Sequence, residues 1–190
     1  LRKRLKPIKN SPSRRTFVWG SWNDGVYRNV SEELLLEQAE SLKKYFPQVK
    51  WLQLDDGYTS FCDENPDRGA HGLGAAYEGE EGTDKKKFPH GLDGFTENVK
   101  AHGLRPAVWI GGLCPKDTRI CKEHPRWFID YSSRIPDSSP LDVSIPQVRQ
   151  YISYALDKFF AEDGFEGVKL DFWTYAFEDS HDLLKNKDRS

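Results

Sequence analysis

The sequence predicts an α/β fold of parallel strands joined by helices, and three observations lead to this prediction. Short apolar runs typical of buried strands alternate with segments of helical periodicity, four times along the chain. The turns that enter these runs are short, whereas long loops follow the second and third. Polar and aromatic residues stand directly after each run, where such proteins place their functional side chains. Two architectures have this order: an open doubly wound sheet, and about the first four β/α units of a (β/α)8 TIM-type barrel.

The expected strands cover residues 16–20, 49–54, 105–110 and 167–170. Ser31 is expected to cap the first helix, in which apolar residues recur at helical spacing. A second helix is expected over residues 92–102, with Gly103 ending it, and Ser144 is expected to cap a third helix. No G-x-G-x-x-G motif follows the first strand, which weakens a dinucleotide-binding interpretation and favours the barrel.

The chain divides into a short leading segment and one domain. Residues 1–15 are basic and hold two prolines, which predicts a linker or the end of a preceding domain. Residues 16–190 are expected to form the N-terminal half of the barrel, with residues 59–87 and 111–142 as long loops. A complete barrel takes about 250 residues, so the missing second half is expected in the full-length chain.

Composition argues against several classes of partner. The net charge of −2 gives no attraction to nucleic acid or to an anionic membrane. No apolar run approaches the roughly 20 residues that span a bilayer. Cys62, Cys114 and Cys121 have no paired spacing, and the five histidines have no metal-ligand spacing, so we expect no metal and no cofactor. Free thiols suit a reducing compartment, which favours the cytoplasm.

Seven residues at or just after the expected strands are the candidate site. The carboxyl ends of barrel strands meet at one mouth, which is where these enzymes hold their active sites. The candidates are Trp22 after the first strand, Asp55 and Asp56 after the second, Trp109 at the end of the third, Lys169 within the fourth, and Asp171 and Trp173 after it.

The fourth strand is the most informative, because side chains alternate along a strand. Val168, Leu170 and Phe172 share an apolar face suited to covering helices, whereas Lys169 and Asp171 share the face that points into the barrel. A buried ion pair is one interpretation of this lysine and aspartate. The interpretation we favour is that the charge of Lys169 keeps Asp171 ionised, so that the carboxylate can attack an anomeric carbon.

The other candidates also have plain structural interpretations. Asp55 and Asp56 precede a glycine and could form a solvated turn, but paired carboxylates also accept hydrogen bonds from vicinal sugar hydroxyls. Trp22 and Trp109 could be core residues, but flat rings at strand ends also form the walls of sugar pockets. A further acidic group before the fourth strand is expected to be a solvated turn: Glu162, Asp163 and Glu166.

Several short motifs resemble the melibiase group of glycoside hydrolases, chiefly family 36 α-galactosidases, and they occur in the family's order over roughly residues 17–175. These motifs are Ser21-Trp22-Asn23, Leu54-Asp55-Asp56-Gly57-Tyr58, Phe88-Pro89-His90-Gly91-Leu92, Gly103-Leu104-Arg105-Pro106-Ala107-Val108-Trp109, His124-Pro125-Arg126-Trp127, Leu141-Asp142-Val143 and Val168-Lys169-Leu170-Asp171.

The resemblance implies a role for each matching residue. Asp171 matches the nucleophile of a retaining mechanism, which forms a covalent glycosyl-enzyme intermediate without a metal. Lys169 matches a substrate-binding lysine, and Asp55 and Asp56 match the pair that holds the sugar's distal hydroxyls. By the same resemblance, Trp22 and Trp109 match pocket aromatics, and an α-galactoside or related oligosaccharide is the expected ligand.

Two features depart from the family pattern. Trp173 stands where the family has asparagine, and residues 110–113 (Ile-Gly-Gly-Leu) replace the usual acidic residues, so the identity of the sugar stays open. The family's acid/base aspartate follows the sixth strand, so we expect this chain alone to lack it and to be inactive. A galactosyl transferase of the raffinose-synthase kind and a non-catalytic galactoside-binding barrel are the alternatives.

Overall fold

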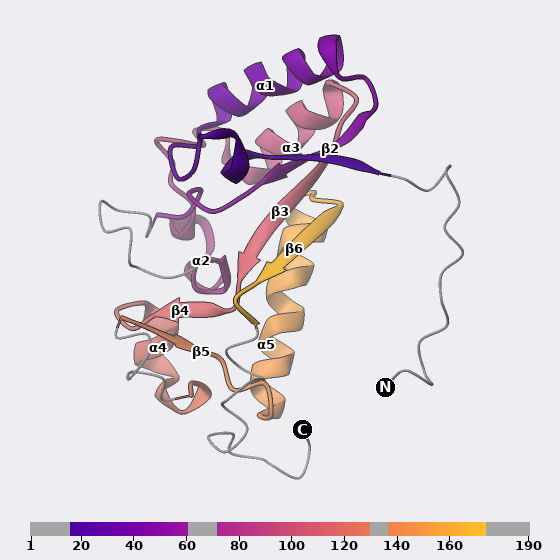
Figure 1. Cartoon of the computed structure of the whole chain (residues 1–190). Coiled ribbons are helices and arrows are strands. Elements are labelled where there is room, and N and C mark those ends of the chain that lie inside the picture. Colours follow the sequence, from indigo (N-terminus) through magenta and orange to yellow (C-terminus); the bar gives the residue numbers. More distant parts are fainter. Residues whose placement is uncertain (1–15, 61–71, 130–136, 174–190) are drawn as a thin grey trace, which may run out of the picture.

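Four parallel strands form one sheet in the computed structural model, which describes residues 16–60, 72–129 and 137–173 (Figure 1). The strands are β1 (Phe17–Gly20), β2 (Val49–Leu54), β3 (Arg105–Gly111) and β6 (Gly167–Asp171). Their order in the sheet, β1-β2-β3-β6, is also their order along the chain. The four predicted strands are therefore confirmed to within a residue at each end.

The strand order distinguishes the two predicted architectures. Each strand pairs in parallel with the one before it, so the sheet advances in a single direction. A doubly wound sheet reverses its strand order at a switch point, whereas barrel strands follow chain order. The sheet is therefore consistent with part of a TIM-type barrel, and the doubly wound alternative does not account for it.

Three helices make the crossovers between these strands: α1 (Glu32–Tyr45), α3 (Gly91–Ala101) and α5 (Pro146–Asp157). The predicted cap of α1 is confirmed, because the Ser31 hydroxyl oxygen accepts a hydrogen bond from the Leu34 N–H at 3.2 Å. Short turns join α1 to β2 and α3 to β3, and the two longest connections leave the carboxyl ends of β2 and β3. Loops at this end of the sheet can therefore carry the side chains of a functional site.

The predicted cap of α5 is wrong. Ile145 is the N-cap of this helix, and Pro146 takes the first turn, where its missing N–H leaves no donor unsatisfied. Ser144 is instead fixed by Asp142, whose Oδ1 accepts hydrogen bonds from both the backbone N–H and the hydroxyl of Ser144. A serine that precedes a helix was thus mistaken for its cap, because a carboxylate two residues earlier competes for the same groups.

The two long loops contain regular elements that we did not predict. They are α2 (Gly72–Glu78) and η3 (Gly79–Gly82) after β2, then β4 (Leu113–Pro115), α4 (Arg119–Glu123), η4 (Pro125–Trp127) and β5 (Ser138–Pro140) after β3. Strands β4 and β5 pair antiparallel in a separate small sheet. These elements span three to seven residues, too short for a periodicity to appear in the sequence.

Burial falls from the centre of the sheet to its edges. In β3 every residue after Arg105 is buried. In the edge strands, by contrast, Phe17 and Val18 are both 53% exposed and Leu170 is 52% exposed. The face of β6 that we expected helices to cover is therefore open among the described residues. A closed barrel has no free edge and covers such side chains.

The acidic segment before β6 is only partly a solvated turn. Glu166 is half-exposed and its Oε2 lies 2.7 Å from Nε of Arg105. Asp163, however, is buried at the end of the π-helical turn η5 (Lys158–Glu162), with its Oδ1 3.6 Å from the Lys158 ammonium. Its Oδ2 has no hydrogen-bond partner among the described residues, and burial raises the pKa of this carboxyl above its usual range.

Replacing Asp163 with asparagine is expected to raise the melting temperature of the full-length protein by roughly 2 °C near pH 8. Because the pKa of Asp163 is raised on folding, its ionised form is less favourable in the folded state. Stability contributed by the protonated form is lost as pH rises from the unfolded pKa through the folded one. The gain should therefore shrink as melting is measured at lower pH, as the pH falls through the raised pKa of the folded state towards that of the unfolded state. A lower melting temperature at pH 8 would mean that the contact with Lys158 outweighs burial.

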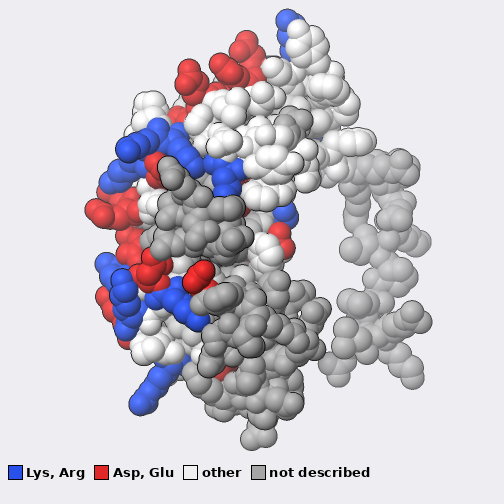
Figure 2. Space-filling model, turned by 60° about the vertical axis from the view of Figure 1, so that its left-hand side comes forward, with Lys and Arg blue, Asp and Glu red and all other residues white. Residues whose placement is uncertain are grey.

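Three further features of the described residues concern membrane spans, surface charge and the cysteines. No helix in the described segments is both long and apolar enough to cross a bilayer. Acidic and basic side chains intermingle on the face drawn in Figure 2, as expected for a nearly neutral chain. Cys114 is buried and Cys121 half-buried, both carry free thiols, and burial raises both thiol pKa values. Cys62 and residues 1–15 lie outside the described residues.

Candidate active site at the carboxyl ends of the strands

A cavity of about 610 Å³ opens at the carboxyl ends of the four parallel strands. Six of the seven predicted site residues line it, together with four residues that we did not predict. The lining residues are Trp22, Tyr27, Arg28, Asn29, Asp55, Asp56, Trp109, Lys169, Asp171 and Phe172. Side chains from loci more than 100 residues apart thus meet at one place, as the predicted barrel mouth requires.

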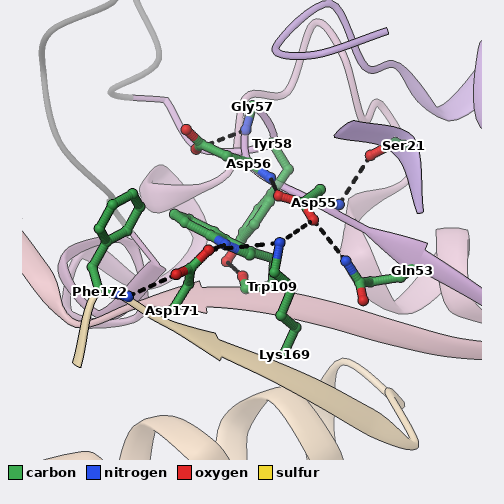
Figure 3. Close-up of polar contacts among 10 residues, drawn as sticks. All are labelled: Ser21, Gln53, Asp55, Asp56, Gly57, Tyr58, Trp109, Lys169, Asp171 and Phe172. Atoms are coloured by element: carbon green, nitrogen blue, oxygen red, sulfur yellow. Dashed lines mark hydrogen bonds and ion pairs between the residues drawn. The ribbon is translucent and has the colours of Figure 1, made fainter. Parts of the chain in front are cut away.

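Lys169 stands between two of the three carboxylates (Figure 3). Its ammonium donates to Asp55 Oδ2 at 3.0 Å and lies 3.6 Å from Asp171 Oδ2. One cation therefore offsets the repulsion between two anions that β2 and β6 bring together. The predicted pairing of Lys169 with Asp171 is present, but its shorter contact is to Asp55.

Asp171 is held so that its carboxylate faces the cavity. Oδ2 accepts a hydrogen bond from the Trp109 indole N–H at 3.1 Å, and Oδ1 accepts one from the Phe172 backbone N–H at 2.9 Å. The Asp171 side chain remains 41% exposed, so a substrate can reach it. An oriented, accessible carboxylate beside an ammonium is what an attacking nucleophile needs.

Asp55 is buried rather than part of a solvated turn, with only 3% of its surface exposed. Its Oδ2 accepts from Gln53 at 2.6 Å as well as from Lys169, and its Oδ1 accepts from the Asp56 N–H at 3.0 Å. The Asp55 N–H in turn donates to the Ser21 hydroxyl at 3.0 Å, which ties β2 to the end of β1. Together these contacts hold the carboxylate and the backbone of Asp55 in place on the cavity floor.

Asp56 is equally buried and is held by a residue that we did not predict. Its Oδ2 lies 2.9 Å from Arg28 Nε, and its Oδ1 accepts from the Gly57 N–H at 2.8 Å. The Lys87 ammonium donates to the carbonyl oxygens of Arg28 and Gly57, at 2.9 and 2.8 Å. Arg28 and Lys87 thus clamp the turn that carries Asp56.

The three predicted tryptophans occupy different positions relative to the cavity. Trp109 is 2% exposed and forms part of the floor, whereas Trp22 is half-buried and meets Tyr27 edge to face, with ring centroids 5.4 Å apart. Trp173 does not line the cavity. Its indole N–H donates to the Ile110 carbonyl at 3.3 Å, and it packs so closely on Gly112 that a Cβ there would come within 3.1 Å.

Phe172 does not follow the alternation that we predicted for the fourth strand. Strand β6 ends at Asp171, and the backbone of Phe172 turns into the left-handed region with φ of 60°. Its ring therefore swings to the cavity, where its centroid lies 6.2 Å from that of Trp109 (Figure 3). The expected placement of Phe172 with Val168 and Leu170 is wrong, because a strand's period ends where the strand ends.

The residues that we did not predict have little signal in the sequence. Arg28 and Asn29 lie in a turn before α1, eight and nine residues beyond the end of β1, and only the fold brings them to the same cavity as Asp56. The only local signal in the sequence is the glycine that follows Asp56. In the structure, Gly57 has φ of 117°, a backbone conformation that residues with a side chain rarely adopt. No group of three or more potential metal ligands occurs among the residues the structure describes.

Several known proteins resemble this chain. An α-galactosidase of Escherichia coli is 26% identical over 153 residues, which cover 78% of this chain and 20% of the relative. The α-galactosidase Mel36A of Lactobacillus acidophilus is 26% identical over 80% of this chain and 18% of its own length. The chain therefore spans about a fifth of the length of these curated relatives.

Solved structures share the fold. The family 36 α-galactosidase AgaA of Geobacillus stearothermophilus superposes with a TM-score of 0.67 at 23% identity, over 82% of this chain and 21% of that one. An α-galactosidase of Thermus thermophilus, solved with p-nitrophenyl α-D-galactopyranoside, gives 0.66 at 22% identity, over 90% and 33%. The sequence profile of the family named Melibiase matches residues 1–189, and the chain therefore belongs to the melibiase family.

Proposed function

We propose that this chain provides the galactose-binding floor and the nucleophile of a retaining glycoside hydrolase that acts on α-galactosides. One observation carries the proposal: the oriented, accessible carboxylate of Asp171 faces the same cavity as the buried pair Asp55 and Asp56. Family membership supports it, as do relatives named α-galactosidases. Variants of the Geobacillus enzyme AgaA have been solved with raffinose and with stachyose.

In the proposed mechanism, the Asp171 carboxylate attacks the anomeric carbon as the bond to the leaving oxygen breaks. The hydrogen bonds from Trp109 and Phe172 hold the carboxylate in place for this attack. The α-linked substrate becomes a β-linked glycosyl-enzyme, and a water molecule then displaces Asp171 to give the α product. Asp55 and Asp56, each buried and anchored, accept hydrogen bonds from the sugar's distal hydroxyls.

The leaving oxygen also needs a proton, and we propose that its donor lies outside the described residues. Asp55 and Asp56, the two other carboxyls that line the cavity, are poorly placed to donate this proton. Both oxygens of each contact nitrogen donors, so each carboxylate acts as a hydrogen-bond acceptor. We further propose that residues 16–190 are the first four β/α units of the barrel. The rest of the polypeptide would then complete the barrel, supply the acid/base residue and cover the apolar edges of β1 and β6.

The test uses the complete gene product and a panel of nitrophenyl α- and β-glycosides. We expect turnover of the α-galactoside, with α-galactose as the first anomer detected by NMR. Appearance of the β anomer first would exclude retention, and absence of turnover on α-galactosides would contradict the proposed substrate. Repeating the reaction with excess acceptor sugar separates a hydrolase from a transferase, since a transferase would yield galactosylated acceptor in place of free galactose.

A further inference from the structure

Tyr58 does not line the cavity, but it joins two parts of the structure that do. It follows the Asp55-Asp56-Gly57 turn directly in the chain, and its hydroxyl donates a hydrogen bond to the Trp109 carbonyl oxygen at 3.0 Å (Figure 3). Tyr58 is 1% exposed and Trp109 is 2% exposed, so water cannot easily take the place of this hydroxyl. The segment after β2 is thereby tied to β3 inside the core.

This hydrogen bond lies just beyond the point where β2 and β3 stop pairing. The last pair between these strands joins Leu54 to Val108, and Trp109 comes one residue later. On its other side Trp109 still pairs with Lys169 of β6. The Tyr58 hydroxyl therefore attaches Trp109 to the connection after β2, where the strand itself no longer does so.

Trp109 in turn holds the carboxylate of Asp171. Its indole N–H donates to Asp171 Oδ2 at 3.1 Å, which is near the long end of the usual range for such a bond. Because the indole is packed within the hydrophobic core, a shift of the Trp109 backbone carries the N–H with it. A small shift would thus weaken the contact and let the carboxylate turn away from its position for attack.

The surroundings leave the Tyr58 side chain a single place to lie. Its ring meets Phe159 edge to face, with centroids 6.5 Å apart, and its carbonyl accepts from the Asp84 N–H at 2.9 Å. A Cβ added at Gly72 would lie 3.1 Å from the Tyr58 hydroxyl oxygen and 3.0 Å from Cα of Ile110 in β3. The hydroxyl is therefore enclosed against the backbone of the strand that carries Trp109.

We propose that Tyr58 is a positioning residue that acts through Trp109 to orient the Asp171 carboxylate. The inference rests on the proposed function, in which Asp171 is the nucleophile. Asp55 and Asp56 have anchors of their own in Lys169 and Arg28, so holding the sugar does not depend on the Tyr58 hydroxyl. Loss of this hydroxyl should therefore slow formation of the glycosyl-enzyme and leave the affinity for galactose unchanged.

The first test is Tyr58→Phe in the complete gene product, a change that removes only the hydroxyl. We expect kcat/KM for nitrophenyl α-galactoside to fall by about tenfold, while the inhibition constant of galactose stays within about twofold of the wild type. A rise of that inhibition constant as large as the fall in kcat/KM would mean that Tyr58 serves sugar binding, and it would overturn the inference. No loss of kcat/KM would overturn it as well.

Tyr151→Phe is the matched control for the loss of a buried hydroxyl. Tyr151 is 7% exposed, and its hydroxyl also donates to a backbone carbonyl, that of Leu73 in α2, but neither residue lines the cavity. This variant should lose stability in the same way and keep kcat/KM within about twofold of the wild type. Equal losses of kcat/KM in the two variants would reduce the effect at Tyr58 to general stability and overturn the inference.

A double-mutant cycle tests whether Tyr58 acts through Trp109. Trp109→Phe removes the indole N–H, so the hydroxyl of Tyr58 then has no contact with Asp171 to support. Adding Tyr58→Phe to Trp109→Phe should lower kcat/KM by less than about twofold further, because residues that act as one unit are not additive. A further loss of about tenfold would show that Tyr58 acts by another route and would overturn the inference.

A spectroscopic measurement separates this inference from the proposed function, since it needs no turnover. In protein labelled with 5-fluorotryptophan, Trp109→Phe identifies the fluorine NMR signal of Trp109. Asp171→Asn should shift that signal, because the negative charge beside the indole N–H is lost. In the Tyr58→Phe background the same substitution should cause less than half of that shift. This result would uphold the role of Tyr58 even if no α-galactoside were hydrolysed, whereas an undiminished shift would overturn it even in an active α-galactosidase.

Discussion

Replacing Asp171 with alanine in the complete gene product is expected to lower kcat/KM for α-galactosides by about 10⁴-fold or more, because the reaction then has no group to form the covalent intermediate. The vacated space also gives a direct chemical test. Azide is a small anion that can enter where the carboxylate was and attack the anomeric carbon from the same face. Activity should return with azide when the leaving group needs no proton, as with nitrophenolate, and the product should be β-galactosyl azide.

The matched control for this prediction is Asp171→Asn. Its carbonyl oxygen can still accept a hydrogen bond from Trp109 or Phe172, so the local structure is retained while the negative charge and the nucleophile are lost. We expect the asparagine variant to be as inactive as the alanine variant, with a melting temperature close to that of the wild type and no rescue by azide. If Asp171→Asn kept more than about a tenth of wild-type kcat/KM, Asp171 would not be the nucleophile.

The sequence could predict the elements whose cause is local. The strand over Val49–Leu54 is an apolar run between turns, and its observed bounds are those expected. Ser31 is followed by two glutamates in the first turn of α1, and all three agree with a helix start. By contrast, Ser144 also stands shortly before a helix, but Ile145 is the N-cap of α5 and Asp142 holds the Ser144 hydroxyl instead.

The residues of the candidate site also divide into those that the sequence could predict and those that it could not. Asp55, Asp56 and Asp171 could be found because parallel strands bring their carboxyl ends together, and strand ends can be read from a sequence. Arg28 could not be found, because nothing local relates it to Asp56, 28 residues away. Phe172 was misplaced because the alternation rule gives the wrong face one residue past the end of β6, where the backbone turns left-handed.

The clamp on Asp56 depends on a glycine, and this leads to the second large effect. Gly57 has φ of 117°, and a Cβ added there would lie 2.7 Å from Cα and 2.9 Å from the carbonyl oxygen of Arg28. Those are backbone atoms, so no side-chain rotation relieves the collision. Moving that carbonyl also disturbs the hydrogen bond from Lys87 and the contact between Arg28 and Asp56.

Gly57→Ala is therefore expected to destabilise the full-length protein by more than about 3 kcal/mol, through backbone strain and overpacking together. In the protein that still folds, kcat/KM for α-galactosides should fall about tenfold to a hundredfold, because a displacement near 1 Å suffices for such a loss. Thermal denaturation and steady-state kinetics measure the two effects.

Gly25→Ala separates the collision from the strain. Gly25 also has a positive φ, of 77°, but a Cβ there would meet nothing within 4 Å. The strain alone should cost about 1 kcal/mol and leave kcat/KM within about threefold of the wild type. If both variants lost the same stability and activity, the contact of Gly57 with the Arg28 backbone would not matter, and the clamp would not be what holds Asp56 in place. A loss confined to Gly57→Ala, in contrast, would make the position of the Arg28 backbone a requirement for binding the sugar's distal hydroxyls.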